Sequence, residues 1–188
     1  MSRVRRLPGE EAKKVAGEIG MSETMADLAV FQVVLNDPPV AAALNDLLMT
    51  LLSKGALDAR LRELIIMRIG WATGSEYEWT QHWRVAGMLG VDPDDVLAVR
   101  DWRSSDRLGD AERAVLAATD ETIETGRISS ETWAACAEAL GNDDAKLVEL
   151  VIAIGNWRLF SSLLLSLEVP LEDGVEPWPP DGLRPPTA

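Results

Sequence analysis

The chain is poor in the residue types that most often carry redox or metal chemistry. It contains one cysteine and one histidine. A single cysteine excludes an intrachain disulfide and any CxxC redox or metal site. Cys136 lies beside Ala135 and Ala137 in a helical pattern, where a small buried apolar side chain is expected rather than a nucleophile. One histidine and no HExxH motif make a poor ligand set for zinc, so we expect no metal and no other cofactor.

Long apolar runs and a positive net charge are absent as well. The most apolar stretch, 147–167, is interrupted by Glu149, Asn156 and Arg158, and no apolar segment of a secretory signal follows the basic first residues. The net charge is −13, from 31 acidic against 18 basic residues, and such a field repels phosphates and anionic lipid surfaces. We therefore expect a soluble, cytoplasmic protein that binds neither nucleic acid nor membranes.

Helical patterning replaces strand patterning along the whole chain. No segment sustains the alternation of a strand, whereas apolar positions recur at helical spacing between Gly, Pro and Asp breaks. This predicts an all-α fold of about eight helices. We expect a polar lead-in over residues 1–20, a helical domain over 21–170 and a proline-rich tail over 171–188. Trp178 in the tail predicts that the tail packs on its own domain or on a neighbouring subunit.

The stretch 63–82, ELIIMRIGWATGSEYEWTQH, is where chemistry is most expected. Ser75, Glu78 and His82 lie at positions i, i+3 and i+7, which confines them to an arc of roughly 60° on one helix face. Glu78 and His82 are four residues apart and can touch, and a carboxylate beside an imidazole favours the imidazolium and fixes its tautomer. Such a pair suits general acid–base catalysis. Ser75 and His82 are separated by about 10.5 Å of helix rise, too far for a serine nucleophile and its base.

Tryptophans surround the same stretch. Seven of the ten aromatic residues are tryptophan, and Trp71, Trp79 and Trp83 fall within or beside residues 63–82. They are candidates for the apolar walls of a substrate site, with core packing as the alternative. For His82 the alternative is a core histidine with satisfied hydrogen bonds.

Two overlapping capping boxes leave the start of the helix that carries His82 open. If Ser75 is the N-cap, Glu78 reaches back to the helix start and is not free for catalysis. If Thr73 is the N-cap, Glu76 takes that role and Glu78 can face inward with His82. We favour Thr73.

Two interpretations of Glu63 are open. It can pair with Arg60 in a solvated first turn that also includes Arg62. If Ser75 is the N-cap of the next helix, Glu63 is instead the one carboxylate left to His82.

The spacing Glu63-x11-Ser75-x2-Glu78-x3-His82 resembles the carboxymuconolactone decarboxylase and alkylhydroperoxidase D superfamily. Its peroxidase branch has Glu-x11-Cys-x2-Cys-x3-His, so Ser75 and Glu78 stand where the two redox cysteines would be. Its decarboxylase branch has Glu-x3-His, matched by Glu78 and His82. The flanking text LDARLRELIIMRIGWATGSEYEWTQHWRVA and the later NWRLFSSLLLSLEVPL are also similar, so the resemblance covers most of residues 40–172.

The resemblance implies an orthogonal helical bundle of the alkylhydroperoxidase D type, assembled as a homotrimer or homohexamer. It also implies proton-transfer chemistry by His82 and Glu78 with Glu63 as a relay carboxylate, and no disulfide-relay peroxidase. The expected function is a cofactor-free decarboxylation, isomerisation or lactone opening on a small organic acid or lactone. The alternatives are a non-catalytic oligomeric ligand-binding protein and, less favoured, an antioxidant protein. Three arginines are close enough in sequence to be considered for a substrate carboxylate: Arg68, Arg84 and Arg158.

Overall fold

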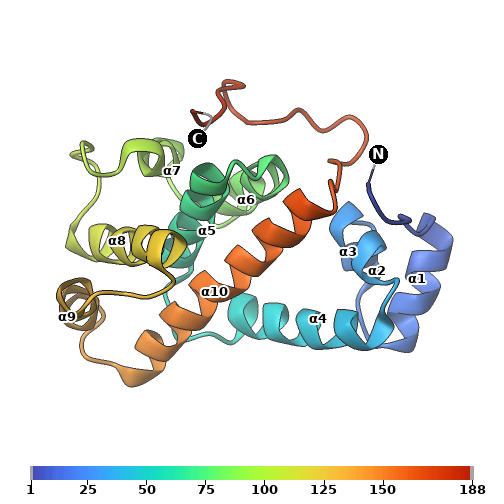
Figure 1. Ribbon diagram of the computed structural model, residues 1–188, viewed down its shortest axis with the longest axis horizontal. Coiled ribbons are helices and arrows are strands. Elements are labelled where there is room, and N and C mark those ends of the chain that lie inside the picture. The colour runs from blue at the N-terminus through green and yellow to red at the C-terminus, as the bar shows by residue number, and fades with distance from the viewer. Residues whose placement is uncertain (1, 187–188) are drawn as a thin grey trace. The chain divides into compact units, whose positions relative to one another are not determined.

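A computed structural model describes residues 2–186, and these fold into ten α-helices and one 3-10 helix, with no strand among them (Figure 1). The predicted all-α class is confirmed. The helices are α1 (Gly9–Glu18), α2 (Glu23–Ala26), α3 (Ala29–Val34), α4 (Pro38–Ser53), α5 (Ala59–Thr73), α6 (Glu76–Met88), α7 (Pro93–Ala98), η1 (Val99–Asp101), α8 (Asp110–Thr125), α9 (Ser130–Ala139) and α10 (Asp144–Ser166).

The α-helices outnumber the expected eight because α1 forms within the lead-in and because the segment after Met21 is divided into α2 and α3. Leu28 takes an extended backbone conformation, with φ −78° and ψ 134°, and so separates α2 from α3. Ser22 caps α2 by accepting a hydrogen bond from the Met25 amide. The apolar spacing from Met25 to Val34 predicted one continuous helix, because periodicity alone does not register a single extended residue.

The chain forms two compact units. The first comprises residues 1–54 and 163–175. Its helices α1, α2 and α3 pack on one another, and α3 also contacts α4. Ala12 and Ala16 of α1 are fully buried, and so is most of α3. Residues of the expected polar lead-in therefore form a helix and contribute to the core of this unit.

The second unit comprises residues 55–162 and 176–188 and contains every candidate site residue. Helix α5 lies at its centre and packs on α6, α8 and η1, while α8 packs on α9. The inward-facing residues form a core that includes Leu64, Met67, Trp71, Trp79, Val99, Trp102, Leu116 and Trp178. Helix α5 is buried on most sides, which explains the near-continuous apolar run in its sequence.

The crossing of α5 and α6 is fixed at both ends of α5. Asp58 caps the start of α5 by accepting hydrogen bonds from the amides of Arg60 and Leu61. Gly74 ends α5 in the left-handed conformation, at φ 72°. Gly70 allows α6 to approach, since a Cβ there would lie 3.0 Å from the Trp79 amide nitrogen. These contacts bring the Glu63 carboxylate of α5 within reach of α6.

The proline-rich tail packs on its own chain. Trp178 is 3% exposed and donates its backbone amide to Thr80 and its indole N–H to Glu76. The Trp79 indole donates to the carbonyl of Pro179, and Asp181 forms two hydrogen bonds with the Arg100 guanidinium. Of the two packing partners considered for Trp178, the structure therefore shows its own chain.

One helix, α10, is long and apolar enough to cross a membrane by length and composition alone. Half of its most apolar window is buried within the protein. The core helices of soluble proteins pass the same test, so this is weak evidence for a membrane span.

Candidate active site

Glu63 and His82 form the centre of the candidate site. His82 Nδ1 lies 2.8 Å from Glu63 Oε2, and the Glu63 side chain is fully buried, whereas that of His82 is 16% exposed. The other Glu63 oxygen accepts a hydrogen bond of 3.3 Å from the Arg62 guanidinium, which is also buried. The interpretation of Arg62 and Glu63 as a solvated first turn is therefore wrong. Arg60 pairs instead with Asp95 and Glu112.

Helix α10 contributes a partner to the second nitrogen of His82. The indole N–H of Trp157 donates to His82 Nε2 over 3.3 Å, and the two rings meet edge to face at 85°. An acceptor at Nε2 requires a lone pair there, so the proton of the neutral imidazole lies on Nδ1, toward Glu63. Trp157 and Glu63 together select one tautomer.

Glu78 does not contact His82 through a hydrogen bond, in contrast to the predicted direct pair. It is 2% exposed and its Oε2 is hydrogen-bonded to the Ser161 hydroxyl of α10. Burial raises the pKa of Glu78 from 4.5 to about 8, although the nearby hydroxyls of Ser161 and Ser75 oppose the shift. Glu78 is thus a neutral carboxylic acid at pH 7, one helical turn before an imidazole that is paired elsewhere.

Neither of the predicted capping boxes forms. Thr73 is the last residue of α5 and its hydroxyl donates to the Ile69 carbonyl, so the favoured Thr73 start of α6 is wrong. Ser75 occupies the N-cap position, but its side chain makes no capping hydrogen bond. Both Ser75 Oγ and Glu78 Oε1 are buried without a hydrogen-bond partner. Glu78 is therefore not held by a cap, and its burial against α10 sets its direction.

The three tryptophans of this stretch pack mainly in the core. Trp79 is fully buried, and its ring lies 5.3 Å from Trp71, 6.1 Å from Trp178 and 6.4 Å from Trp83. The Arg100 guanidinium lies over Trp71 and Trp79, at 4.7 and 4.8 Å from the ring centroids. The prediction that Trp71 and Trp79 form substrate walls is thus not supported by their placement. Trp83 is only partly buried.

Two of the three candidate arginines are committed to structure. Arg68 binds both carboxylate oxygens of the buried Asp120, and Arg158 donates to the carbonyl of Thr122. Neither is available for a substrate carboxylate without breaking these bonds. Arg84 is exposed.

The only cysteine, Cys136, lies in the core on α9. Its thiol donates to the carbonyl of Ala114, and burial raises its pKa to about 11. The thiol therefore stays protonated at neutral pH and is a poor nucleophile, as the sequence predicted.

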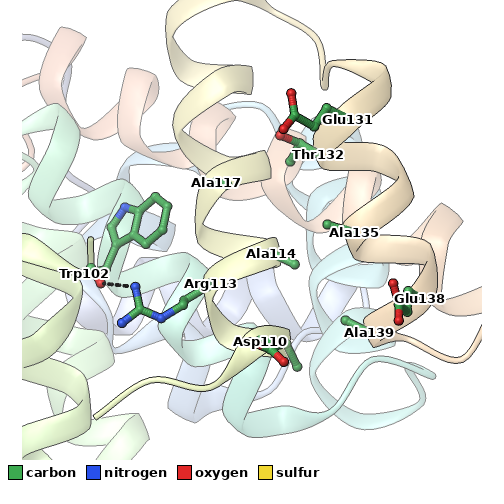
Figure 2. A pocket seen from close by; sticks show the side chains of 11 residues that line it. Trp102, Asp110, Arg113, Ala114, Ala117, Glu131, Thr132, Ala135, Glu138 and Ala139 are labelled. Atoms are coloured by element: carbon green, nitrogen blue, oxygen red, sulfur yellow. Dashed lines mark hydrogen bonds between the residues drawn. The ribbon is translucent and has the colours of Figure 1, made fainter. Parts of the chain in front are cut away.

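A separate groove of about 700 Å³ lies between α8 and α9, away from His82 (Figure 2). Alanines and three carboxylates line much of it, and its one cation is Arg113. The Arg113 guanidinium donates to the backbone carbonyls of Trp102, Arg103, Ser105 and Leu108, so it is not free to bind an acid. This groove does not suit an anionic substrate.

Sequence reasoning missed four residues that shape the site: Arg62, Thr73 as a hydroxyl partner, Trp157 and Ser161. Trp157 and Ser161 lie four residues apart on α10 and meet two residues, His82 and Glu78, that are also four apart on α6. The only signal in the sequence was the presence of polar residues within the apolar run 147–167. That signal does not reveal which helix they face.

The comparisons with known proteins agree with this fold. Residues 38–121 match the family model "Carboxymuconolactone decarboxylase family". No curated protein matches the sequence significantly. Among solved structures, a variant of the debrominase Bmp8 in complex with 2,3,4-tribromopyrrole has a TM-score of 0.73 at 17% identity, covering 92% of this chain and 95% of that one.

Two further structures are similar. An uncharacterised peroxidase-related protein from Silicibacter sp. TM1040 has a TM-score of 0.72 at 15% identity, covering 92% of this chain and 90% of its own. The alkylhydroperoxidase AhpD core of a peroxidase-related protein from Ralstonia eutropha JMP134 has a TM-score of 0.72 at 17% identity, covering 92% and 93%. Residues 38–121 are therefore similar to the carboxymuconolactone decarboxylase family, and the fold of the chain is that of AhpD-like proteins.

Proposed function

We propose that the protein is a cofactor-free acid–base enzyme that decarboxylates, isomerises or opens a small organic acid or lactone. The observation that carries this proposal is the 2.8 Å contact between the buried Glu63 carboxylate and the partly exposed imidazole of His82. A carboxylate behind an imidazole orients the ring and stabilises the imidazolium that forms when the ring takes a proton.

His82 and Glu78 have different roles in the proposed reaction. His82 acts as the base through Nε2, because Nδ1 is bound to Glu63 and the Trp157 contact at 3.3 Å is long enough for a substrate to displace. Glu78 acts as the acid, since burial holds its pKa at about 8. An accessible imidazole and a buried carboxylic acid suit the removal of one proton and the delivery of another.

A decarboxylation would proceed as follows. The bond between the substrate carbon and its carboxylate breaks, the electron pair stays on that carbon, and carbon dioxide leaves. The carbon takes the proton of Glu78, and the Glu78 carboxylate regains a proton from solvent. An isomerisation differs in that His82 first removes a proton from carbon before Glu78 supplies one at another position.

Peroxide reduction is not proposed. The relatives described as peroxidase-related or as a debrominase show the fold that this chain shares. In this chain Ser75 and Glu78 occupy the positions of the superfamily's redox cysteines, and the Cys136 thiol is buried with a pKa of about 11.

The test is turnover of a panel of small carboxylated lactones and related acids in deuterium oxide, with carbon dioxide release and deuterium incorporation as readouts. Glu78→Gln should lower both reactions by about 10²- to 10⁴-fold, and His82→Ala should lower the isomerisation, in which His82 is the base, by a similar factor. The exposed Glu131→Gln on α9 serves as the matched control and should retain activity. Full turnover in both site variants would show that the site is wrongly assigned.

Ligand binding without conversion is the second candidate. It is favoured by the two buried, unpartnered atoms Ser75 Oγ and Glu78 Oε1, which a polar ligand could satisfy. In that case the panel yields stoichiometric retention of a compound in native mass spectrometry, with no product and no deuterium exchange.

We also propose that the chain assembles into a homo-oligomer. Along α10, Val148, Val151, Ile152 and Leu159 are 58, 47, 43 and 45% exposed and lie on one helix face. Ile152→Glu should reduce the assembly size in analytical ultracentrifugation, whereas Met88→Glu, at a residue 78% exposed on α6, should not. An unchanged assembly, or a monomeric wild type, would reject this face as an interface.

A further inference from the structure

Glu78 stands at the end of a chain of hydroxyl groups that connects three helices. The Thr73 hydroxyl of α5 lies 2.7 Å from the Ile69 carbonyl and 2.8 Å from Ser161 Oγ of α10. Ser161 Oγ in turn contacts Glu78 Oε2 of α6. Ser161 and Glu78 are 1 and 2% exposed, so bulk water does not reach these contacts freely.

The number of hydrogens decides how these contacts can be satisfied. Three contacts need three hydrogens, but the hydroxyls of Thr73 and Ser161 supply one each. If Thr73 donates to Ile69, Ser161 must donate to Thr73, and no hydrogen remains for the contact with Glu78. Only a protonated Glu78, donating from Oε2 to Ser161, completes the row.

We propose that Thr73 and Ser161 are positioning residues that hold Glu78 as a neutral acid, with every hydrogen in the row directed from Glu78 through Ser161 and Thr73 to the Ile69 carbonyl. The use of Glu78 as a source of protons for catalysis rests on the proposed function. The direction of the hydrogen bonds from Glu78 to Ile69 is independent of it.

The charged side chains considered on α5, α6 and α10, within the part of the chain that the structure describes, are bound to other partners. On α5, Glu63 is bound to Arg62 and His82, and on α6, Glu76 accepts from the Trp178 indole. On α10 the nearest charged residues along the helix have other partners: Glu149 accepts from the amides of Ala56 and Leu57, and Arg158 donates to Thr122. The pKa of Glu78, raised to about 8 by burial, agrees with the neutral state.

The hydrogen bonds of Ser161 and Thr73 can also rearrange when Glu78 loses its proton. Once Glu78 is a carboxylate, Ser161 can rotate its hydrogen from Thr73 to Glu78 Oε2, and Thr73 can rotate its own toward Ser161. The anion then gains a donor, at the cost of the bond to Ile69. Thr73 therefore controls whether Ser161 favours the acid or the anion.

The test is infrared spectroscopy of the carboxylic acid carbonyl band as a function of pH, on the full chain and without any substrate. Burial raises the pKa of Glu78 to about 8, so the acid band at pH 7 that belongs to Glu78 should disappear in Glu78→Gln. Thr73→Val preserves the side-chain shape and frees the hydrogen of Ser161 for Glu78. It should lower the midpoint of the band by about one pH unit.

Three variants make the result specific. Thr73→Ser keeps the hydroxyl and should retain the wild-type midpoint. Thr119→Val is the matched control, because Thr119 is a buried threonine that bonds the Val115 carbonyl in the same way on α8. In a Ser161→Ala background, Thr73→Val should have no further effect, since the link between Thr73 and Glu78 is gone.

An unchanged or raised midpoint in Thr73→Val would overturn the proposal, because it would mean that Ser161 already donates to a Glu78 carboxylate. Absence of the acid band at pH 7 in the wild type would do the same. Lack of turnover on every substrate would reject the proposed function and leave these infrared results unaffected.

Discussion

The imidazole of His82 pairs with Glu63, nineteen residues earlier on the neighbouring helix, and not with Glu78 one turn before it on its own helix. Helix α6 crosses α5 closely at Gly70, and the Glu63 carboxylate is fully buried between Arg62 and His82. Glu78 is instead hydrogen-bonded to Ser161 of α10. The candidate site thus has the hydrogen-bonded Glu63–His82 pair on one side and the buried acid Glu78 on the other.

Replacing Glu63 with Gln removes the negative charge beside the buried Arg62 guanidinium. We expect the free energy of unfolding to fall by about 3 kcal/mol, since breaking a buried ion pair leaves one charge uncompensated. Urea denaturation measures this loss. Glu131→Gln should change stability by less than about 0.5 kcal/mol because its carboxylate is exposed. A site variant as stable as this control would show that Glu63 does not compensate Arg62.

Replacing Trp157 with Phe keeps an aromatic ring beside His82 but removes its N–H donor. The loss of one hydrogen bond should destabilise the fold by about 1 kcal/mol. Because the chain has one histidine, ¹⁵N-histidine labelling gives one pair of ring nitrogen signals. The Nε2 signal should move in this variant while Nδ1 stays protonated against Glu63. An unmoved Nε2 signal would mean that the indole does not bond this nitrogen.

Glu78 should make the protein less stable as pH rises from about 4.5 to about 8. In this interval the folded chain keeps the proton on Glu78 and the unfolded chain has released it, because the folded pKa is raised to about 8. The stabilisation is complete below pH 4.5 and is lost by pH 8, with an upper bound of about 5 kcal/mol. Glu78→Gln should flatten the pH dependence of thermal unfolding over this range. Parallel curves for variant and wild type would contradict the raised pKa.

Trp178 should anchor the tail to the second unit. Trp178→Ala opens the tryptophan cluster at a residue that is 3% exposed, and the expected cost is about 3–5 kcal/mol. Trp133→Ala removes the same side chain at a position 40% exposed and should cost much less. Chemical denaturation of the two variants provides the comparison. Equal costs would show that the tail contributes little to the core.

Cys136 should have no part in any peroxide consumption by the protein. Its thiol is buried, and its pKa of about 11 leaves almost no thiolate at neutral pH. Cys136→Ser should therefore consume peroxide at the wild-type rate in a coupled assay. A lower rate in a variant that is still folded would support the hypothesis that the protein is a thiol-dependent antioxidant.

Several features of the protein follow from its sequence alone. Helical spacing determined the all-α class, and local capping chemistry determined the start of α5 at Asp58. The motif from Glu63 to His82 indicated the resemblance to the family because all of its residues lie in one continuous stretch. Periodicity and capping depend on neighbours within a few residues, so they can be read without a fold.

Only the tertiary structure decided which side chains of the site contact one another. The choice between Glu63 and Glu78 as the partner of His82 depends on the closeness of α5 and α6 at Gly70, and the burial of Glu78 depends on Ser161 of α10. The pKa of Glu78 is raised because water is excluded from all sides, which no window of sequence reports. The sequence locates the motif, but residues of other helices, such as Ser161 of α10, determine the protonation state of Glu78 within it.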